Sequence, residues 1–377
     1  MNRPVGAKLN AATTDFRLVR RADWVILILV SVLLGIGLVG LRSIALSGAP
    51  SYFNRQILWA LIGLCALLVG LIIDCERLGR YVGVIYGVNL CLLLIVAIAG
   101  NEAKGAVRWI GVGSFRFQPS EFSKLFIIVS LASLFNRRAG TTQHAAVFLR
   151  SLGHIALPVL LVLKQPDLGT AVSIIAVWVG ISFIAGLPLR YHIIFAVAAL
   201  GLFLIAWRIG FIHDYQIARL TACVNPDADP RGAGYQIRQA RIAVGSGQLL
   251  GKGFGRGTQA HGRFIPERQT DFLFTVLAEE GGFVLCFGVI ALYVWLLLRG
   301  WAIVGASREP MSRYVATGIV SMFSFHMAVN IGMTIGLLPV TGVPLPFMSY
   351  GGSSMIVSLA AVGLLVGISM RHERLVF

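Results

Sequence analysis

The sequence predicts an all-α membrane protein that crosses the bilayer about ten times. Hydrophobic residues make up 57% of its 377 residues and charged residues only 13%, and the mean hydropathy is +0.81. Soluble domains carry about 25% charged residues, so this composition is typical of a polytopic membrane protein. The apolar residues also gather in runs of about 17 to 25, long enough to cross the hydrocarbon core as helices.

Ten apolar runs follow one another along the chain, and the fifth, 152–163, is shorter than the others. The polar and basic tail 1–22 is longer than the charged head of a signal peptide, so we expect the first run to be retained as a span. The chain then forms one transmembrane domain that ends in a short tail, 371–377. The expected spans are 24–41, 57–73, 81–99, 120–135, 152–163, 170–186, 193–207, 272–298, 314–337 and 347–370.

The positive charges predict which side of the membrane each loop faces. Lysine and arginine are concentrated in the tails and in the short loops on the N-terminal side, which is typical of cytoplasmic segments. Both termini are therefore expected in the cytoplasm, and the long segment 208–271 is expected outside. This segment is longer than a connector needs to be. Its apolar side chains predict a partly ordered extracytoplasmic loop, with an amphipathic stretch at 237–244 compatible with a helix on the membrane surface.

The net charge of +16 restricts the possible partners. The basic residues are dispersed between apolar runs, without the basic helix or aromatic-interleaved patch that binds nucleic acids. Their excess fits membrane lipid with anionic headgroups, or a substrate that carries phosphate. Of the five cysteines, only Cys223 lies in the long loop, which excludes a disulfide framework and a clustered-thiol metal site.

A glycine-rich stretch, 245–259, stands out in the long loop. It lacks the spacing of a phosphate-binding loop, and Gly253 follows Lys252 where Ser or Thr belongs. Two interpretations stay open. The stretch is a flexible, turn-rich segment, or Lys252 and Arg256 bind a diphosphate together with backbone amides that glycine leaves accessible.

A second polar cluster precedes the fourth span. Arg108 and Arg116 lie before it, and Glu121 and Lys124 lie three residues apart on one helical face. A capped helix with a local ion pair is the simpler alternative. Lys124 is one turn inside an otherwise apolar span, however, and ionisable residues at such depth mark a site or a cavity.

Two further clusters interrupt the apolar runs on the same side. Asp167 either belongs to a site or is the N-cap of the sixth span. The proline-rich stretch 338–346, followed by Ser349, Tyr350 and paired glycines, predicts broken or re-entrant backbone. In the ninth span, His326 and Asn330 are expected to join helices by hydrogen bonds rather than to bind a metal.

The carboxylate of greatest interest is Asp271, where the long loop enters the eighth span. By itself it is best interpreted as an N-cap. Because the polar clusters converge on one side of the membrane, it becomes a candidate base opposite a bound anion. Glu279 and Glu280, further along the same helix, are assigned to helix packing or to pairing with cations. The expected cations around Asp271 are Arg108, Arg116, Lys124 and Lys252.

Together these motifs resemble the SEDS family of peptidoglycan glycosyltransferases, from the first span to the last. Within that family, PER at 266–268 and GKG at 251–253 are more similar to the elongation members than to the division members. The other matching motifs are FQPSE at 117–121, QPDLGT at 165–170, GAGYQ at 232–236, TDF at 270–272, AEE at 278–280 and SYGGS at 349–353.

The resemblance implies that lipid II is polymerised at the outer face of the cytoplasmic (inner) membrane during cell elongation, with Asp271 as the catalytic base. It also implies a class B penicillin-binding protein of PBP2 type as transpeptidase partner, among other elongation-complex membrane proteins. A lipid diphosphate leaves as an anion, so cations, or a divalent Mg²⁺ or Mn²⁺ ion, would replace a general acid. We hypothesise that Glu121 and Asp167 orient those cations. The expected substrate-binding residues are Arg108, Arg116, Glu121, Lys124, Asp167, Lys252, Arg268, Ser349 and Tyr350.

Two alternatives belong to other functional classes. A flippase for a lipid-linked oligosaccharide would need charges distributed through the bilayer, whereas these spans are nearly free of them. A non-catalytic scaffold of a cell-wall complex would not depend on Asp271.

Overall fold

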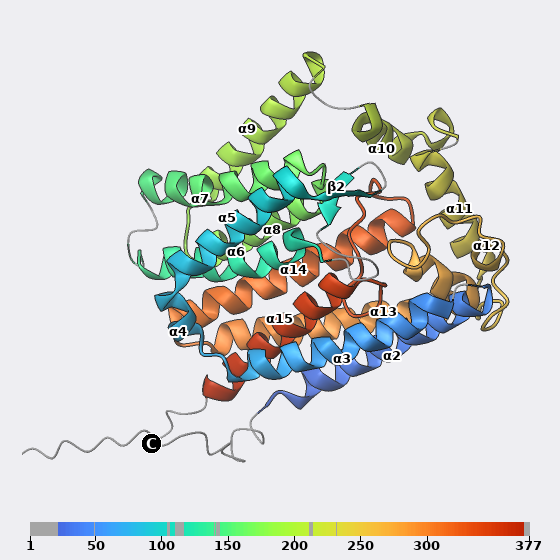
Figure 1. Ribbon diagram of the computed structural model, residues 1–377, viewed down its shortest axis with the longest axis horizontal. Coiled ribbons are helices and arrows are strands. Elements are labelled where there is room, and N and C mark those ends of the chain that lie inside the picture. Colours follow the sequence, from blue (N-terminus) through green and yellow to red (C-terminus); the bar gives the residue numbers. More distant parts are fainter. Residues whose placement is uncertain are drawn as a thin grey trace, which may run out of the picture.

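The computed structural model describes residues 22–372, apart from 49, 104–105, 110–116, 139, 141–143, 211–213 and 231. Within these residues, each of the ten predicted spans coincides with a helix, and most of these helices run along the long axis of the molecule (Figure 1). The ten helices are α2 (Trp24–Leu46), α3 (Pro50–Ile72), α5 (Val82–Ala99), α6 (Pro119–Asn136), α7 (Ala145–Lys164), α8 (Leu168–Ile184), α9 (Leu189–Arg208), α13 (Leu273–Ala306), α14 (Pro310–Thr334) and α15 (Gly352–His372).

Seven of the described helices are long and apolar enough to cross a membrane, and α5 and α8 contain shorter apolar helices. The protein is therefore a multi-span membrane protein, and the number ten stays a prediction. The described part also contains a small antiparallel hairpin, β1 (Asn101–Ala103) with β2 (Ala106–Trp109), which the sequence did not indicate. The remaining short helices are α4 (Cys75–Arg80), α10 (Asp214–Val224), η1 (Pro226–Ala228), α11 (Ala233–Ser246) and α12 (Thr258–His261).

Helix α14 lies in the middle of the bundle, in contact with α6, α8 and α13. Helix α9 has no buried residue and stands away from the other helices in Figure 1. Between membrane helices, close packing takes the place of the hydrophobic effect, and small residues allow it. At the α3–α15 contact, a Cβ on Gly363 would lie only 2.2 Å from the Leu67 carbonyl oxygen, so the two backbones approach closely.

One side chain of the last helix caps the second of the ten helices. Arg371 donates hydrogen bonds to the carbonyls of Leu71, Ile72 and Ile73, at 3.0, 2.8 and 2.6 Å. These carbonyls end α3 and have no partner further along that helix. The cation thus satisfies them and complements the negative end of the helix dipole.

The long loop has a small core of its own. Ile237, Ala240 and Ala243 of α11 are buried in a cluster with Phe272 and Met333. Helix α11 includes the amphipathic stretch predicted at 237–244, but it packs on α13 and α14. Protein, and not the membrane surface, therefore covers its apolar face.

Helix α13 is broken at Gly282, where φ is +66° and ψ is −164°. The glycine-rich stretch 245–259 supplies the hydrogen bonds that the break removes, from both sides. The amides of Lys252 and Gly253 donate to the carbonyls of Glu279 and Glu280, both at 3.0 Å, while the amides of Phe283 and Val284 donate to the carbonyls of Gln248 and Leu249 at 2.8 and 3.1 Å. The stretch 245–259 therefore bridges the break in α13, and we call this stretch the splint.

Candidate active site

Asp271 lies in a tight turn that leads into α13. The amides of Thr270, Asp271 and Phe272 all converge on the carbonyl of Glu267, at 3.1, 3.0 and 3.4 Å. Glu267 adopts φ +53°, in the left-handed region that few non-glycine residues occupy. The N-cap of α13 is Phe272, and no side chain caps the helix there. The N-cap interpretation of Asp271 is therefore wrong, because the helix begins one residue too late for it.

Two apolar clusters hold this turn from opposite sides. Phe272 is fully buried in the small core of the long loop, whereas Leu273 is fully buried in the main core of the helical bundle. Asp271 itself is only partly buried. The carboxylate thus has a fixed backbone and an accessible side, as a base that meets a substrate requires.

Asn330 of α14 connects the turn to the segment after α14. Its side-chain amide donates to the carbonyl of Asp271 at 3.0 Å and to the carbonyl of Val343 at 2.8 Å. Gly342 adopts φ +75°, and a Cβ at this position would lie 3.6 Å from Asp271 Oδ2. The proline-rich stretch 338–346 therefore faces the Asp271 carboxylate. It is non-helical, as its prolines predict, and its residues range from buried to exposed.

Asp167 joins the N-termini of α6 and α8. Its carboxylate accepts the amide of Thr170 at 3.3 Å and is thus the N-cap of α8. The other oxygen accepts the Thr170 hydroxyl at 2.9 Å, Gln118 Nε2 at 3.1 Å and the Ser120 hydroxyl at 3.2 Å. The N-cap interpretation of Asp167 is confirmed, and its role in a site stays a prediction. A Cβ on the nearby Gly169 would lie 2.7 Å from Val343. The α8 cap therefore packs on the segment that faces Asp271.

Glu121 and Lys124 of α6 form a buried ion pair. Lys124 Nζ lies 2.9 Å from Glu121 Oε2 and 3.3 Å from His326 Nε2, and that nitrogen also lies 3.1 Å from the Ser173 hydroxyl. Both charged side chains are almost inaccessible, at 5% and 2% exposed. The local ion pair of the simpler interpretation is therefore present. The side-chain cap of that interpretation is absent, because the N-cap residue of α6 is Gln118 and its side chain makes no cap hydrogen bond.

His326 and Asn330 do join helices by hydrogen bonds, as predicted. They lie one turn apart on α14, and they link it to α6, α8 and the turn before α13. Their contacts place the Glu121–Lys124 pair one helical turn from the residue that holds Asp271.

Ser349 and Tyr350 shape the turn before α15. The amide of Leu345 donates to the Ser349 hydroxyl at 2.9 Å, and Gln56 of α3 donates to the Ser349 carbonyl at 3.0 Å. The Tyr350 amide donates to the carbonyl of Gln269 at 2.9 Å, two residues before Asp271. The structure therefore brings this predicted cluster to the Asp271 turn as well.

Arg268 is a buried cation three residues from Asp271. It is 6% exposed. Its Nη2 donates to the Ser47 hydroxyl at 2.8 Å, while Nη1 has no hydrogen-bond partner among the described residues. Burial, and then the nearby charge of Arg263, lowers the pKa of Arg268. A desolvated guanidinium with an unused donor is suited to an anion.

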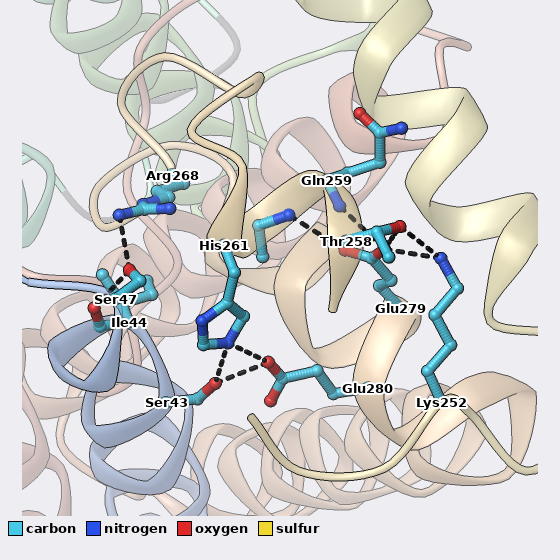
Figure 2. A network of polar contacts seen from close by, with 11 residues as sticks. Ser43, Ile44, Ser47, Lys252, Thr258, Gln259, His261, Arg268, Glu279 and Glu280 are labelled. Atoms are coloured by element: carbon cyan, nitrogen blue, oxygen red, sulfur yellow. Dashed lines mark hydrogen bonds and ion pairs between the residues drawn. The ribbon is translucent and has the colours of Figure 1, made fainter. Parts of the chain in front are cut away.

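Lys252 and Glu279 form an ion pair at the splint. Figure 2 shows Glu279 surrounded by donors: Lys252 Nζ at 2.7 Å, the Thr258 hydroxyl at 3.0 Å and the amides of Gln259 and Ala260 at 2.9 and 3.0 Å. The idea that amides of this stretch face a diphosphate is wrong for Lys252 and Gly253, because both donate to α13. Pairing of Glu279 with a cation was the favoured prediction and is confirmed.

Glu280 connects α13 to α2 and α12. It accepts the Ser43 hydroxyl, and His261 Nε2 lies 3.2 Å from both of these side chains (Figure 2). Sequence reasoning did not single out Ser43 or His261. No local sequence pattern marks these two residues. Ser43 lies more than two hundred residues from its partner Glu280, and His261 lies on a different helix from Glu280.

Two predicted cations are not part of this description. Arg116 lies outside the described residues, as does the side chain of Arg108, whose backbone belongs to β2. In the described part of the chain, no three His, Cys, Asp or Glu side chains gather as a metal site would require.

Comparison with known proteins gives one consistent result. Residues 19–374 match the family model of the FtsW, RodA and SpoVE cell cycle proteins. The chain is 40% identical to the peptidoglycan glycosyltransferase MrdB of Escherichia coli K12, over 76% of this chain and 77% of that one.

Solved structures agree with this match. A chain from a peptidoglycan synthase complex that coordinates polymerization and crosslinking superposes with a TM-score of 0.80 at 31% identity, covering 94% of this chain and 99% of that one. Thermus thermophilus RodA, a rod shape determining protein, gives a TM-score of 0.69 at 31% identity, covering 92% and 96%.

Proposed function

Because the chain belongs to the cell cycle protein family of FtsW, RodA and SpoVE, we propose that the turn at Asp271 is where it builds glycan strands. The protein is a membrane-embedded peptidoglycan glycosyltransferase of the RodA and MrdB type, which determines cell shape. We further propose lipid II as its substrate and the outer face of the cytoplasmic membrane as the side of the reaction. Both termini then lie in the cytoplasm.

One observation supports this site above all. Asp271 is the carboxylate on which the predicted clusters converge, and its backbone is fixed by Asn330 while its side chain stays partly accessible. In the proposed step, Asp271 accepts the proton from the 4-hydroxyl of the acceptor sugar as that oxygen bonds to the anomeric carbon of the donor. The electron pair of the donor's bond to oxygen leaves with the lipid diphosphate.

The leaving group needs positive charge, and the described cations are not equal in this respect. Lys124 and Lys252 are each paired with a buried carboxylate. Arg268 donates through one terminal nitrogen to the Ser47 hydroxyl, and its other terminal nitrogen has no hydrogen-bond partner in the described part of the chain. We propose Arg268 as a contact of the diphosphate, together with Arg108 and Arg116. Lys124 then acts by positioning α6, and Lys252 acts by holding the glycine-rich stretch 245–259 to α13.

A polymerisation assay with purified protein, its partner and lipid II tests the proposal. Asp271→Asn keeps the shape of the side chain but cannot accept the proton, so polymer should fall by about 10² to 10⁴-fold. The control is Asp227→Asn, which removes an exposed carboxylate of the same loop and only its pair with Arg238. Full activity of Asp271→Asn would refute the assignment, and transport of lipid II without polymer would favour a flippase.

The partner follows from the same reaction. A synthase complex both polymerises and crosslinks, so we propose that a class B penicillin-binding protein of PBP2 type binds this chain and supplies the transpeptidase. Other membrane proteins of an elongation complex are proposed around this pair. Copurification with such a transpeptidase, and loss of polymer when it is withheld, are the expected results.

A divalent ion is proposed only as a companion of the diphosphate. With one or two carboxylates as its protein ligands, Mg²⁺ or Mn²⁺ would bind mainly through the substrate. EDTA should therefore lower polymerisation while leaving the melting temperature of the substrate-free protein unchanged, and added Mg²⁺ should restore the rate. A lower melting temperature in EDTA would instead indicate a metal held by the protein alone.

A further inference from the structure

A cavity of about 520 Å³ lies between α5, α6 and α7. It is remote from Asp271. Helix α6 starts at Pro119 beside the Asp167 cluster, and its 18 residues extend about 27 Å. The α6 residues that line the cavity, Ser130, Ser133 and Leu134, belong to the last two turns of that helix, and Arg137 directly follows it. The cavity is therefore at the other end of the bundle.

Positive charge dominates this cavity. Arg137, Arg138 and Arg150 line it, and none of the lining residues in the described part of the chain is acidic. Arg137 makes a long contact of 3.5 Å with the carbonyl of Gly79, and Arg150 is exposed. Three guanidinium groups around one space repel one another, so an anion between them is stabilising.

The inner wall is preformed by neutral polar groups. The rings of Tyr86 and His154 stack with centroids 4.1 Å apart and an interplanar angle of 21°. The Tyr86 hydroxyl donates to the His154 carbonyl at 2.8 Å, and His154 Nε2 lies 2.9 Å from the Ser130 hydroxyl. This wall is thus rigid without a ligand.

The surroundings are apolar. Helices α5 and α7 border the cavity, and both also carry exposed apolar side chains, among them Val84, Val88, Leu157 and Leu160. A ligand that enters here meets basic side chains at one end and hydrocarbon-compatible surface along the same two helices. This combination selects an amphiphile over a small soluble anion.

We propose that this cavity binds the headgroup of an anionic phospholipid. One guanidinium group can donate two parallel hydrogen bonds to two oxygens of a phosphate. Basic pockets between membrane helices are typical sites for acidic headgroups. The loop between α6 and α7 is cytoplasmic by the distribution of positive charge, so the lipid would come from the inner leaflet. The site is distinct from the one that handles the glycan substrate and requires no part of that reaction.

Lipid titration of the purified full chain tests the proposal. In a neutral detergent, phosphatidylglycerol should raise the melting temperature in a saturable way, whereas phosphatidylcholine should not. Arg137→Gln with Arg150→Gln should weaken the apparent affinity about 25-fold, or about 5-fold for each basic residue. The matched control, Arg77→Gln with Arg190→Gln, removes two exposed arginines that do not line the cavity and should bind as the parent does.

A second pair of variants keeps every charge. Gly83 lines the cavity and Gly87 does not, and a Cβ on either glycine of α5 would meet nothing within 4 Å. Gly83→Phe should fill the space and abolish the phosphatidylglycerol effect, while Gly87→Phe should leave it intact. Both proteins should fold, since both positions are open.

Three results would overturn the proposal. One is equal stabilisation by phosphatidylcholine, and another is binding by Gly83→Phe as strong as that of the parent. The third is an equal shift with inorganic phosphate at the same concentration, which would assign the cavity to a soluble anion.

Discussion

Asn330 is the single residue whose role the structure defines most sharply. Its side-chain amide donates one hydrogen bond to the carbonyl of Asp271, before α13, and one to the carbonyl of Val343, in the proline-rich stretch. Asn330 is fully buried. It therefore sets where the backbone of the proposed base lies.

Asn330→Ala should destabilise the protein by about 2 to 4 kcal/mol, because it removes a buried hydrogen bond to Val343 and a partly buried one to Asp271. Thermal unfolding in detergent measures this effect. The polymerisation rate per folded molecule should fall as well, because the Asp271 turn loses its link to α14. A variant that retains the parent's rate per folded molecule would contradict this positioning role.

Asn89→Ala is the matched control. Asn89 is also a buried asparagine in a membrane helix, but its Nδ2 has no hydrogen-bond partner among the described residues. Its loss should cost clearly less stability than that of Asn330.

The sequence indicated candidate residues for the site, but the partners that these residues contact were predictable only over short distances. The Glu121–Lys124 pair follows from helix geometry, since three residues separate them. Lys252 and Glu279 are separated by 27 residues, and no periodicity links a loop to a helix in this way. The unused donor of Arg268 likewise depends on burial by other segments.

At the scale of the elements, α13 departs from a regular helix. Its break at Gly282 needs a backbone conformation that is almost restricted to glycine. A Cβ there would also lie 2.3 Å from the amide nitrogen of Gly251, inside the splint.

Gly282→Ala should therefore lower the free energy of unfolding by several kcal/mol, from roughly 1–3 kcal/mol of backbone strain plus the clash. Gly288→Ala, on the same helix with nothing within 4 Å of its Cβ, should be neutral or stabilise by about 0.5–1 kcal/mol. Melting temperatures of the two variants make the comparison. Equal values would show that the break is not rigid.

Element boundaries were predictable where hydrocarbon length decides them and less so elsewhere. The apolar runs locate the membrane helices because lipid leaves no other way to satisfy the backbone. The run at 347–370 overestimates its helix, since α15 begins only at Gly352 and Phe347 adopts φ +66°. Helix α3, in contrast, begins at Pro50, before its apolar run at 57, because polar residues such as Gln56 also face a protein partner.

For the whole molecule, orientation in the membrane is open to a direct chemical test. Cys223 is a partly accessible thiol in α10, while Cys75 and Cys286 are buried and Cys65 and Cys91 lie on apolar helices. A membrane-impermeant maleimide added to intact spheroplasts should therefore label Cys223. Cys223→Ser should abolish the signal.

The opposite side needs a new thiol in that background. His144 is exposed between α6 and α7, so Cys223→Ser with His144→Cys should be labelled only after the membrane is permeabilised. Labelling of His144→Cys in intact spheroplasts would reverse the proposed topology.

The contact between the last helix and α3 has a consequence for how the protein is made. About 300 residues separate Ile72 from Arg371, and a ribosome needs roughly 15 to 60 s to synthesise them at 5–20 residues per second. During that time α3 is already translated but lacks both its packing partner and the cation that caps it. The early helices must therefore wait in the insertion machinery or in lipid, half assembled, until the ribosome completes α15.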